Sequence, residues 1–141
     1  MKASRIRRGV AGAATVVALA GAGVLATAPM AAAKANLIAI DKVSLAAPGL
    51  KVNVTYSCDT GMNHQLVANA EQITSPALQE IGAGTIKASK LTCDYASHTA
   101  QVYLRPGDVR GFAKGDKVKV TVFYFDEDGF RYGDTTATAT V

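Results

Sequence analysis

The fold class is indicated by the C-terminal stretch of the chain, which reads Lys117-Val-Lys-Val-Thr-Val-Phe-Tyr-Phe125, Asp126-Glu-Asp-Gly129 and Phe130-Arg-Tyr-Gly-Asp-Thr-Thr-Ala-Thr-Ala-Thr-Val141. Apolar and polar residues alternate on both sides of the acidic segment, with the period of two residues that half-buried strands show. The acidic segment ends in glycine, which suits the left-handed position of a hairpin turn. We predict an antiparallel hairpin in which Phe125 pairs with Phe130, Val120 with Thr135 and Lys119 with Thr136.

The same alternation recurs upstream, between turns that contain glycine or proline. It is clearest at residues 50–58, where large apolar residues occupy every second position. A short helical turn is expected at residues 76–80 and a loop at 105–115. Seven short strands separated by such turns predict an all-β fold, an immunoglobulin-like β-sandwich. The other expected strands are 37–45 with a bulge near Asp41-Lys42, 64–72, 84–93 with a phase shift between Ile86 and Leu91, and 99–104.

The N-terminal segment has the order of a secretory signal peptide. Residues 1–8 are basic, residues 9–28 are uncharged and rich in alanine, and Pro29-Met-Ala-Ala-Ala-Lys-Ala35 follows. We predict a signal peptide over residues 1–33, cut before Lys34, with a cut before Asn36 fitting almost as well. General secretion is favoured over twin-arginine export. The remaining residues 34–141 are then one secreted domain with no membrane segment.

The charge of the chain is concentrated in this leader. The sequence has 15 Lys and Arg residues and 11 Asp and Glu residues. Five of the basic residues and none of the acidic ones lie in residues 1–35. The remainder is close to neutral, which argues against a nucleic-acid partner or an anionic membrane.

Two cysteines, Cys58 and Cys93, are the whole cysteine content of the chain. An oxidising compartment favours a disulfide between them, and only one intramolecular pairing is possible. Their spacing suggests a link between the second and fourth strands. Two separately buried thiols are the alternative. A zinc site is disfavoured because it would need more ligands than two cysteines and two distant histidines provide.

Three segments give the sequence a resemblance to a known group of proteins: Leu50-Lys-Val-Asn-Val-Thr-Tyr-Ser-Cys58, Leu91-Thr-Cys-Asp94 and Phe112-Ala-Lys-Gly-Asp-Lys-Val118. Together with the alanine-rich leader, they resemble the small secreted domains common in high-GC Gram-positive bacteria. The resemblance implies a disulfide-bonded immunoglobulin-like sandwich. It implies no chemistry, because a fold does not determine a function.

Catalytic and metal-binding residue patterns are sparse. His64 and His98 are the only histidines, and both are expected at the surface without a nucleophile beside them. Asp126 and Asp128 before Gly129 partly match a calcium loop, although the glycine comes two places early and the distal glutamate is missing. We predict a protein that is not an enzyme, has no cofactor and offers calcium at this turn as its one metal candidate.

The aromatic residues of the hairpin are the main binding candidates. In the predicted register, four aromatic rings share the face opposite the valines, while Arg131 lies on the valine face near the tip. Three interpretations remain open: a loop at 105–115 with Phe112 covers the rings, they only stabilise the hairpin, or they form an exposed platform for a partner. The candidate patch consists of Phe123, Phe125, Phe130, Arg131 and Tyr132.

The sequence therefore predicts a secreted, non-enzymatic binding or structural module. Its expected partner is an extracellular protein or polysaccharide, and its expected state is a monomer. The alternative is a secreted proteinaceous inhibitor of an extracellular hydrolase. Such an inhibitor would insert either Arg105-Pro106-Gly107 or the turn at residues 126–129 into the enzyme.

Overall fold

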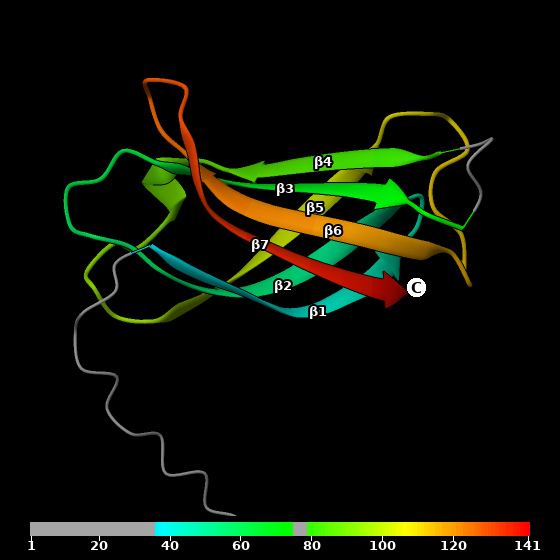
Figure 1. Ribbon diagram of the computed structural model, residues 1–141, viewed down its shortest axis with the longest axis horizontal. Coiled ribbons are helices and arrows are strands. Elements are labelled where there is room, and N and C mark those ends of the chain that lie inside the picture. The colour runs from blue at the N-terminus through cyan, green and yellow to red at the C-terminus, as the bar shows by residue number, and fades with distance from the viewer. Residues whose placement is uncertain (1–35, 75–78) are drawn as a thin grey trace, which may run out of the picture. The chain divides into compact units, whose positions relative to one another are not determined.

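The computed structural model describes residues 36–74 and 79–141. The predicted signal peptide, its cleavage sites and most of the expected helical turn at residues 76–80 lie outside these ranges. The described chain is all-β, as predicted, with seven strands and one short 3-10 helix, η1 (Figure 1). No helix in these two ranges is long and apolar enough to cross a membrane. The elements are β1 (Leu37–Ala46), β2 (Gly49–Ser57), β3 (Gln65–Gln72), β4 (Ile81–Ile86), η1 (Ala88–Lys90), β5 (His98–Pro106), β6 (Lys117–Phe125) and β7 (Arg131–Thr140).

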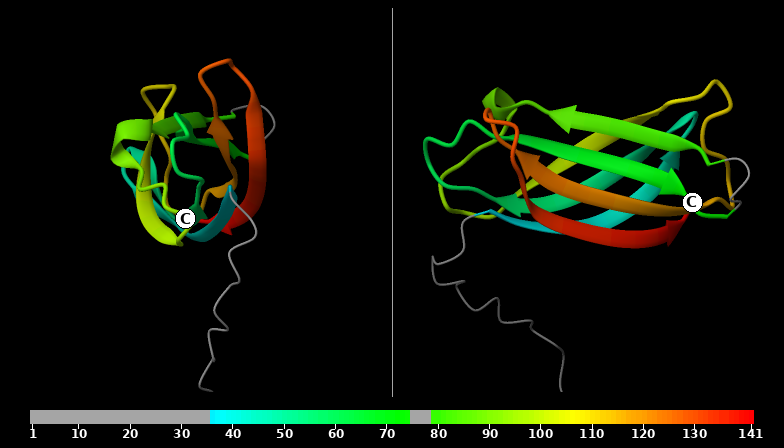
Figure 2. Two further views of the ribbon diagram at one scale, coloured as in Figure 1. Left: turned by 90° about the vertical axis from the view of Figure 1, so that its left-hand side faces the viewer. Right: turned by 45° about the horizontal axis from the view of Figure 1, so that its top comes forward.

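All strand pairs are antiparallel, and the strands follow the order β1-β2-β5-β4-β3-β6-β7. The pairing between β4 and β5 is the weakest, because it covers only Gly82 with Pro106 and Ala83 with Arg105. The strands curve around a common interior, and the two outermost strands, β1 and β7, come into contact (Figure 2).

The interior is built by the alternation seen in the sequence. In β2, Leu50, Val52 and Val54 are fully buried, and they pair with inward residues of β5. Each pair places apolar side chains on the same face, so the strand period of two buries a continuous row. Buried residues of β3 and β6 complete the core: Leu66, Ala68, Ala70, Val118, Val120, Val122 and Tyr124.

Two of the expected strand irregularities have different outcomes. The bulge near Asp41-Lys42 is confirmed, because the register of β1 shifts between Ile40 and Lys42. The strand expected at residues 84–93 is wrong in its second half. The chain leaves the sheet after Ile86, forms η1 and continues as a loop to His98. The phase shift in the sequence therefore marks the end of a strand.

The predicted register of the last hairpin is also wrong. Phe125 pairs with Arg131 and Val120 with Ala137, because the turn contains five residues and a bulge opposite Phe123 inserts one residue more into β7. Gly133 in this bulge has φ +68°, a conformation that glycine adopts without strain. Beyond the bulge the slip amounts to two residues, so each side chain keeps its predicted face.

The predicted disulfide is confirmed. Cys58 and Cys93 are bonded, with their Cα atoms 4.7 Å apart. Cys58 follows β2 directly, whereas Cys93 lies in the connection between η1 and β5. The bond therefore joins the end of the second strand to a loop, and the expected link to the fourth strand is wrong.

Candidate functional site

Three connections meet at one end of the described domain. Because neighbouring strands run in opposite directions, β2, β4 and β6 all end there, at the left of Figure 1. The loop of residues 58–64, the segment of residues 87–97 and the β6–β7 turn at residues 126–130 form this hairpin end. The connection between β5 and β6 lies at the opposite end.

The first two connections are tied together by more than the disulfide. The Tyr95 N–H donates to the Cys58 carbonyl at 3.1 Å, and the Thr92 N–H donates to the Tyr56 hydroxyl at 3.0 Å. The Thr60 hydroxyl donates to the Tyr95 hydroxyl at 3.4 Å. These bonds restrict both loops relative to β2, from which Tyr56 projects.

The hairpin turn is tied to the first loop. Asn63 Nδ2 donates to Glu127 Oε2 at 3.0 Å, and the Tyr132 hydroxyl contacts the His64 ring, with Nε2 at 2.8 Å. The Tyr124 hydroxyl, which is buried, donates to the Ser57 carbonyl at 2.9 Å. Burial raises the pKa of the Tyr124 phenol well above its usual range. All three connections at the hairpin end are therefore cross-linked through hydrogen bonds and one covalent bond.

Within the turn, Asp126 acts as a backbone cap. Its Oδ1 accepts the N–H of Asp128 at 3.0 Å and the N–H of Phe130 at 2.7 Å. Gly129 has φ +88°. This is an Asx-type turn, in which the carboxylate replaces backbone acceptors. In the described ranges, no group of three or more His, Cys, Asp or Glu side chains is placed to hold a metal ion. The structure therefore adds no third side-chain ligand of these types to Asp126 and Asp128 for calcium.

The predicted aromatic patch is divided between two faces. Tyr132 points inward and stacks on Tyr124, with ring centroids 5.7 Å apart. Phe123 is on the outer face but only 6% exposed. Phe125 and Phe130 are exposed, at 38% and 68%. The prediction that the four rings share one face is therefore wrong, and Phe125 and Phe130 are the two that remain exposed.

Arg131 lies on the outer face, and its expected place among the valines is wrong. Its Cζ is 4.0 Å from the centroid of the Phe123 ring, a cation–π geometry. Its guanidinium also binds Asp134 through two nitrogens, Nε at 3.0 Å and a terminal nitrogen at 2.7 Å. The bidentate pair fixes the side chain over Phe123, so Arg131 takes the covering role that we considered for the loop at 105–115.

That loop does not reach the hairpin, so the covering interpretation is wrong. Phe112 is 3% exposed and packs near Gly82 at the opposite end of the sheet. The proposed inhibitor segment Arg105-Pro106-Gly107 is only partly a loop, because Arg105 and Pro106 belong to β5.

The two histidines are half-buried and have different partners. His98 Nε2 lies 2.6 Å from Asp94 Oδ1, and its ring packs at 5.8 Å from the Tyr56 ring. The hydrogen bond from His98 holds the pKa of the exposed Asp94 carboxyl below its usual value. The expectation of simple surface histidines is therefore only partly met. The partners that the structure gives to the two imidazoles, Tyr132 and Asp94, supply neither a serine nor a cysteine nucleophile.

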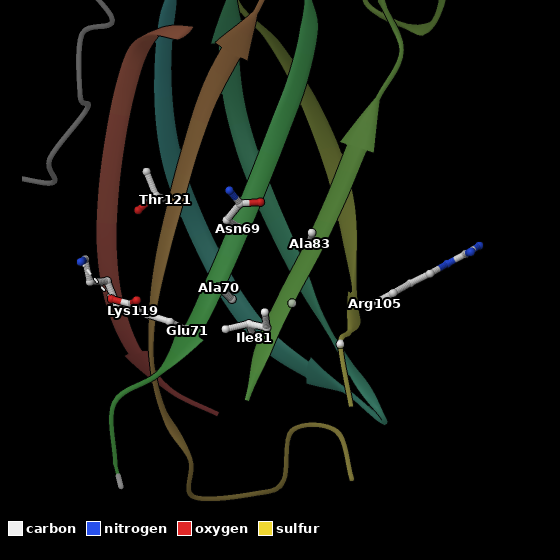
Figure 3. Close-up of a pocket in the computed structure, with 10 residues that line it drawn as sticks. Asn69, Ala70, Glu71, Ile81, Ala83, Arg105, Lys119 and Thr121 are labelled. Carbon is white, nitrogen blue, oxygen red and sulfur yellow. Dashed lines mark hydrogen bonds and ion pairs between the residues drawn. The ribbon is translucent and has the colours of Figure 1, made fainter. Parts of the chain in front are cut away.

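A hollow of about 420 Å³ lies on the outer face of β3, β4 and β6 (Figure 3). Ile81 and Ala83 give it an apolar side, and the ion pair between Glu71 and Lys119, at 3.0 Å, borders it across β3 and β6. Figure 3 shows the Arg105 side chain pointing away from the other lining residues. The hollow was not predicted from the sequence, although the small residues at 82–84 were a usable signal for reduced side-chain volume on β4.

The hairpin end thus combines cross-linked loops with two exposed aromatic rings. No family model, no curated protein and no solved structure matches this chain.

Proposed function

We propose that this protein is a secreted, non-enzymatic binding module that recognises an extracellular protein or polysaccharide through its hairpin patch, defined as Phe125, Phe130 and Arg131. The observation that carries the proposal is the exposure of Phe130, 68%, on a turn whose backbone is fixed by Asp126. An exposed ring on a rigid turn can bury a large area without losing much conformational freedom.

The anchoring of the hairpin end supports this role. The disulfide and the Asn63–Glu127 hydrogen bond connect the three loops, so the patch is presented by a surface that is already ordered. Arg131 contributes a cation that is fixed by Asp134 beside the rings. Aromatic and arginine side chains are the residue types that carry most energy in protein interfaces.

The strand order supports the finer proposal of an immunoglobulin-like sandwich. Constant-type immunoglobulin domains place their first, second, fifth and fourth strands in one sheet and their third, sixth and seventh strands in the other. The order β1-β2-β5-β4-β3-β6-β7 contains the same strands in the same sequence, except that β4 pairs over six positions with β3 and over only two with β5. On this assignment, the loops of the hairpin end correspond to the end that carries the binding loops of variable domains.

Secretion is proposed from two features together. Residues 1–33 have the composition of a signal peptide, and the disulfide is typical of proteins that fold in an oxidising compartment. Bacterial origin is inferred only from the resemblance of the leader and the three quoted segments.

An affinity capture tests the function. The oxidised domain, residues 34–141, is immobilised and exposed to the culture medium and to a cell-wall polysaccharide fraction of the organism that produces the protein. Wild type and a Tyr103→Ala control, which truncates an exposed ring on β5, should retain the same partner. The Phe125→Ala/Phe130→Ala variant should lose it by at least about tenfold in affinity, as hot-spot truncation does. Equal capture by the double variant, or no capture from either fraction, would contradict the proposal.

A further inference from the structure

Strand β5 has one edge that is fully paired and one edge that is largely free. Its pairing with β2 runs over seven positions, between Leu50 and Tyr56 of that strand. Its pairing with β4 covers two positions and stops at Ala83 with Arg105. Figure 1 shows β4 and β5 separating from there toward the hairpin end. Among the described strands, no other one takes the place of β4 along this edge.

The backbone groups on the free edge belong to the odd-numbered residues of β5. The carbonyl oxygen of Leu104 lies beside β2, whereas that of Tyr103 lies beside Gly84 of β4. In an antiparallel strand, the N–H and C=O of one residue point to one neighbouring strand and those of the next residue to the other. The N–H and C=O groups of Thr99 and Gln101 therefore point away from β2, beyond the end of the pairing with β4.

A hollow of about 430 Å³ lies where the two strands separate. It is lined by residues 83–86 of β4 and by residues 101–103 and Arg105 of β5, and we call it the β4–β5 gap. Val102 in this lining is 2% exposed and belongs to the core cluster, and the half-buried Ile86 packs against that cluster. The gap therefore offers free backbone groups and apolar surface at the same place.

The outermost strands of the sheet have features that hinder further pairing, whereas the free edge of β5 has none of them. β1 has a bulge between Ile40 and the exposed Lys42, and β7 has the bulge at Gly133. β1 and β7 also lie against each other. Native sheets use bulges, edge lysines and edge prolines to avoid pairing with other chains. Residues 98–104 of β5 include no lysine, no proline and no shift of register against β2.

We infer that the β4–β5 gap binds an extended segment of a partner polypeptide, which adds to β5 as an antiparallel strand. The free N–H and C=O groups along such an edge are matched by another extended backbone, which presents both groups at the same intervals. Every second side chain of the segment faces inward, onto Ile86 and Val102, so apolar residues are expected at alternate positions. β4 bounds the gap on its other side, which leaves room for one extended chain but not for the edge of another folded sheet.

This inference does not rest on the hairpin patch, so the two proposals fail independently. The Phe125→Ala/Phe130→Ala variant should bind the same extended segments as wild type. A change that blocks the β4–β5 gap should leave capture by the hairpin patch unchanged.

Amide hydrogen exchange of the oxidised domain, followed by NMR, tests whether the edge is open. The amides of Thr99 and Gln101 should exchange at least about 100-fold faster than those of Ala100 and Val102, which point to β2. Sedimentation at the same concentrations should show a monomer. Slow exchange of Thr99 and Gln101 in the monomer would overturn the inference. Protection that grows with self-association would also overturn it, because it would assign the gap to a second copy of the chain.

A random library of nine-residue peptides displayed on phage tests the occupant. Selection on the immobilised wild-type domain should enrich sequences with apolar residues at every second position. Gln101→Pro removes an N–H from the free edge and none from the ladder with β2, so it should lower the affinity for these peptides by about tenfold. Gln101→Val keeps the N–H and is the matched control, which should bind them as wild type does.

Thr85→Pro removes an N–H from the β4 side of the gap and serves as a second variant if Gln101→Pro does not fold. An enriched peptide, prepared synthetically, should slow the exchange of the Thr99 and Gln101 amides in wild type. The inference is overturned if the folded proline variants bind the enriched peptides as tightly as wild type does. It is equally overturned if no peptide with the alternation is enriched, or if the bound peptide leaves both amides unprotected.

Discussion

Gly84 of β4 lies close to the backbone of β5, and its substitution by alanine gives a direct test of how the sheet is joined there. An added Cβ would lie 2.3 Å from the Tyr103 carbonyl oxygen and 2.9 Å from Val102 Cγ1. Favourable contacts between carbon and a carbonyl oxygen begin at about 3.3 Å, so β5 would have to move by about 1 Å.

The free-energy cost of moving β5 depends on the core side chains that this strand contributes. Val102 and Leu104 are 2% and 0% exposed, and both belong to the core cluster. A movement of their backbone disturbs close-packed side chains, and overpacking of this kind costs about 1–3 kcal/mol. The φ angle of Gly84 is outside the left-handed region, so the Gly84→Ala effect is steric.

Urea unfolding followed by far-UV circular dichroism measures the effect, since the chain has no tryptophan for fluorescence. Gly84→Ala should lower the free energy of unfolding by about 1–3 kcal/mol, a sizeable part of the about 5–15 kcal/mol typical of such domains. Ala83→Ser, on the exposed face of the same strand, is the control and should stay within about 0.5 kcal/mol. A loss below about 0.5 kcal/mol for Gly84→Ala would refute the close approach of β4 and β5.

Three other outcomes are expected. Replacing both cysteines by alanine should cost about 4 kcal/mol in chemical unfolding, because the bond closes a loop with a sequence separation of 35; a cost below about 1 kcal/mol would contradict this. The pKa of Asp94 is lowered by His98, so their pair stabilises the folded state at pH values above the unfolded-state pKa. This stabilisation is lost as the pH falls through the folded-state pKa of Asp94. NMR titration should show that the pKa of Asp94 is higher in His98→Ala than in wild type. For Tyr124, the raised pKa means that its contribution is complete below the unfolded-state pKa of about 10 and is lost as the pH rises through the folded-state value. Tyr124→Phe should remove that alkaline dependence and cost about 1–2 kcal/mol at neutral pH, measured by urea unfolding at a series of pH values.

The sequence was sufficient for the all-β class and for most strand positions, because burial on one face imposes a period of two residues. It was insufficient for the hairpin register. The alternation of valine with lysine and of alanine with threonine is equally satisfied by registers that differ by two residues. The choice was made by the bulge at Gly133, and an isolated glycine within a strand is the sequence signal that could have indicated it.

The five-residue turn explains why the candidate site was predicted only in part. Near the turn, the observed pairing differs from the predicted one by a single residue, and a one-residue shift exchanges the faces. Tyr132 thereby moved inside and Arg131 outside. The loop at 105–115 precedes β6, and the hairpin turn follows it. Because β6 runs along the full length of the sheet, the loop and the turn must lie at opposite ends, so the position of the loop was predictable. The hydrogen bonds that hold this loop at Asp108 and Phe112 come from Glu80 and Pro48, residues distant in sequence whose contacts no local pattern reveals.

The position of the disulfide also affects how the chain can find its fold. Pairing of β2 with β5 joins residues such as Asn53 and Gln101, which are 48 residues apart, and contacts so distant in sequence slow folding. Tyr56 lies two residues before Cys58, and its partner His98 lies five residues after Cys93. Once the disulfide has formed, pairing of Tyr56 with His98 closes only a short loop through the bonded cysteines. The remaining β2–β5 pairs can then form one after another, down to Leu50 with Leu104. Oxidation therefore gives this pairing of residues distant in sequence the local character of a hairpin.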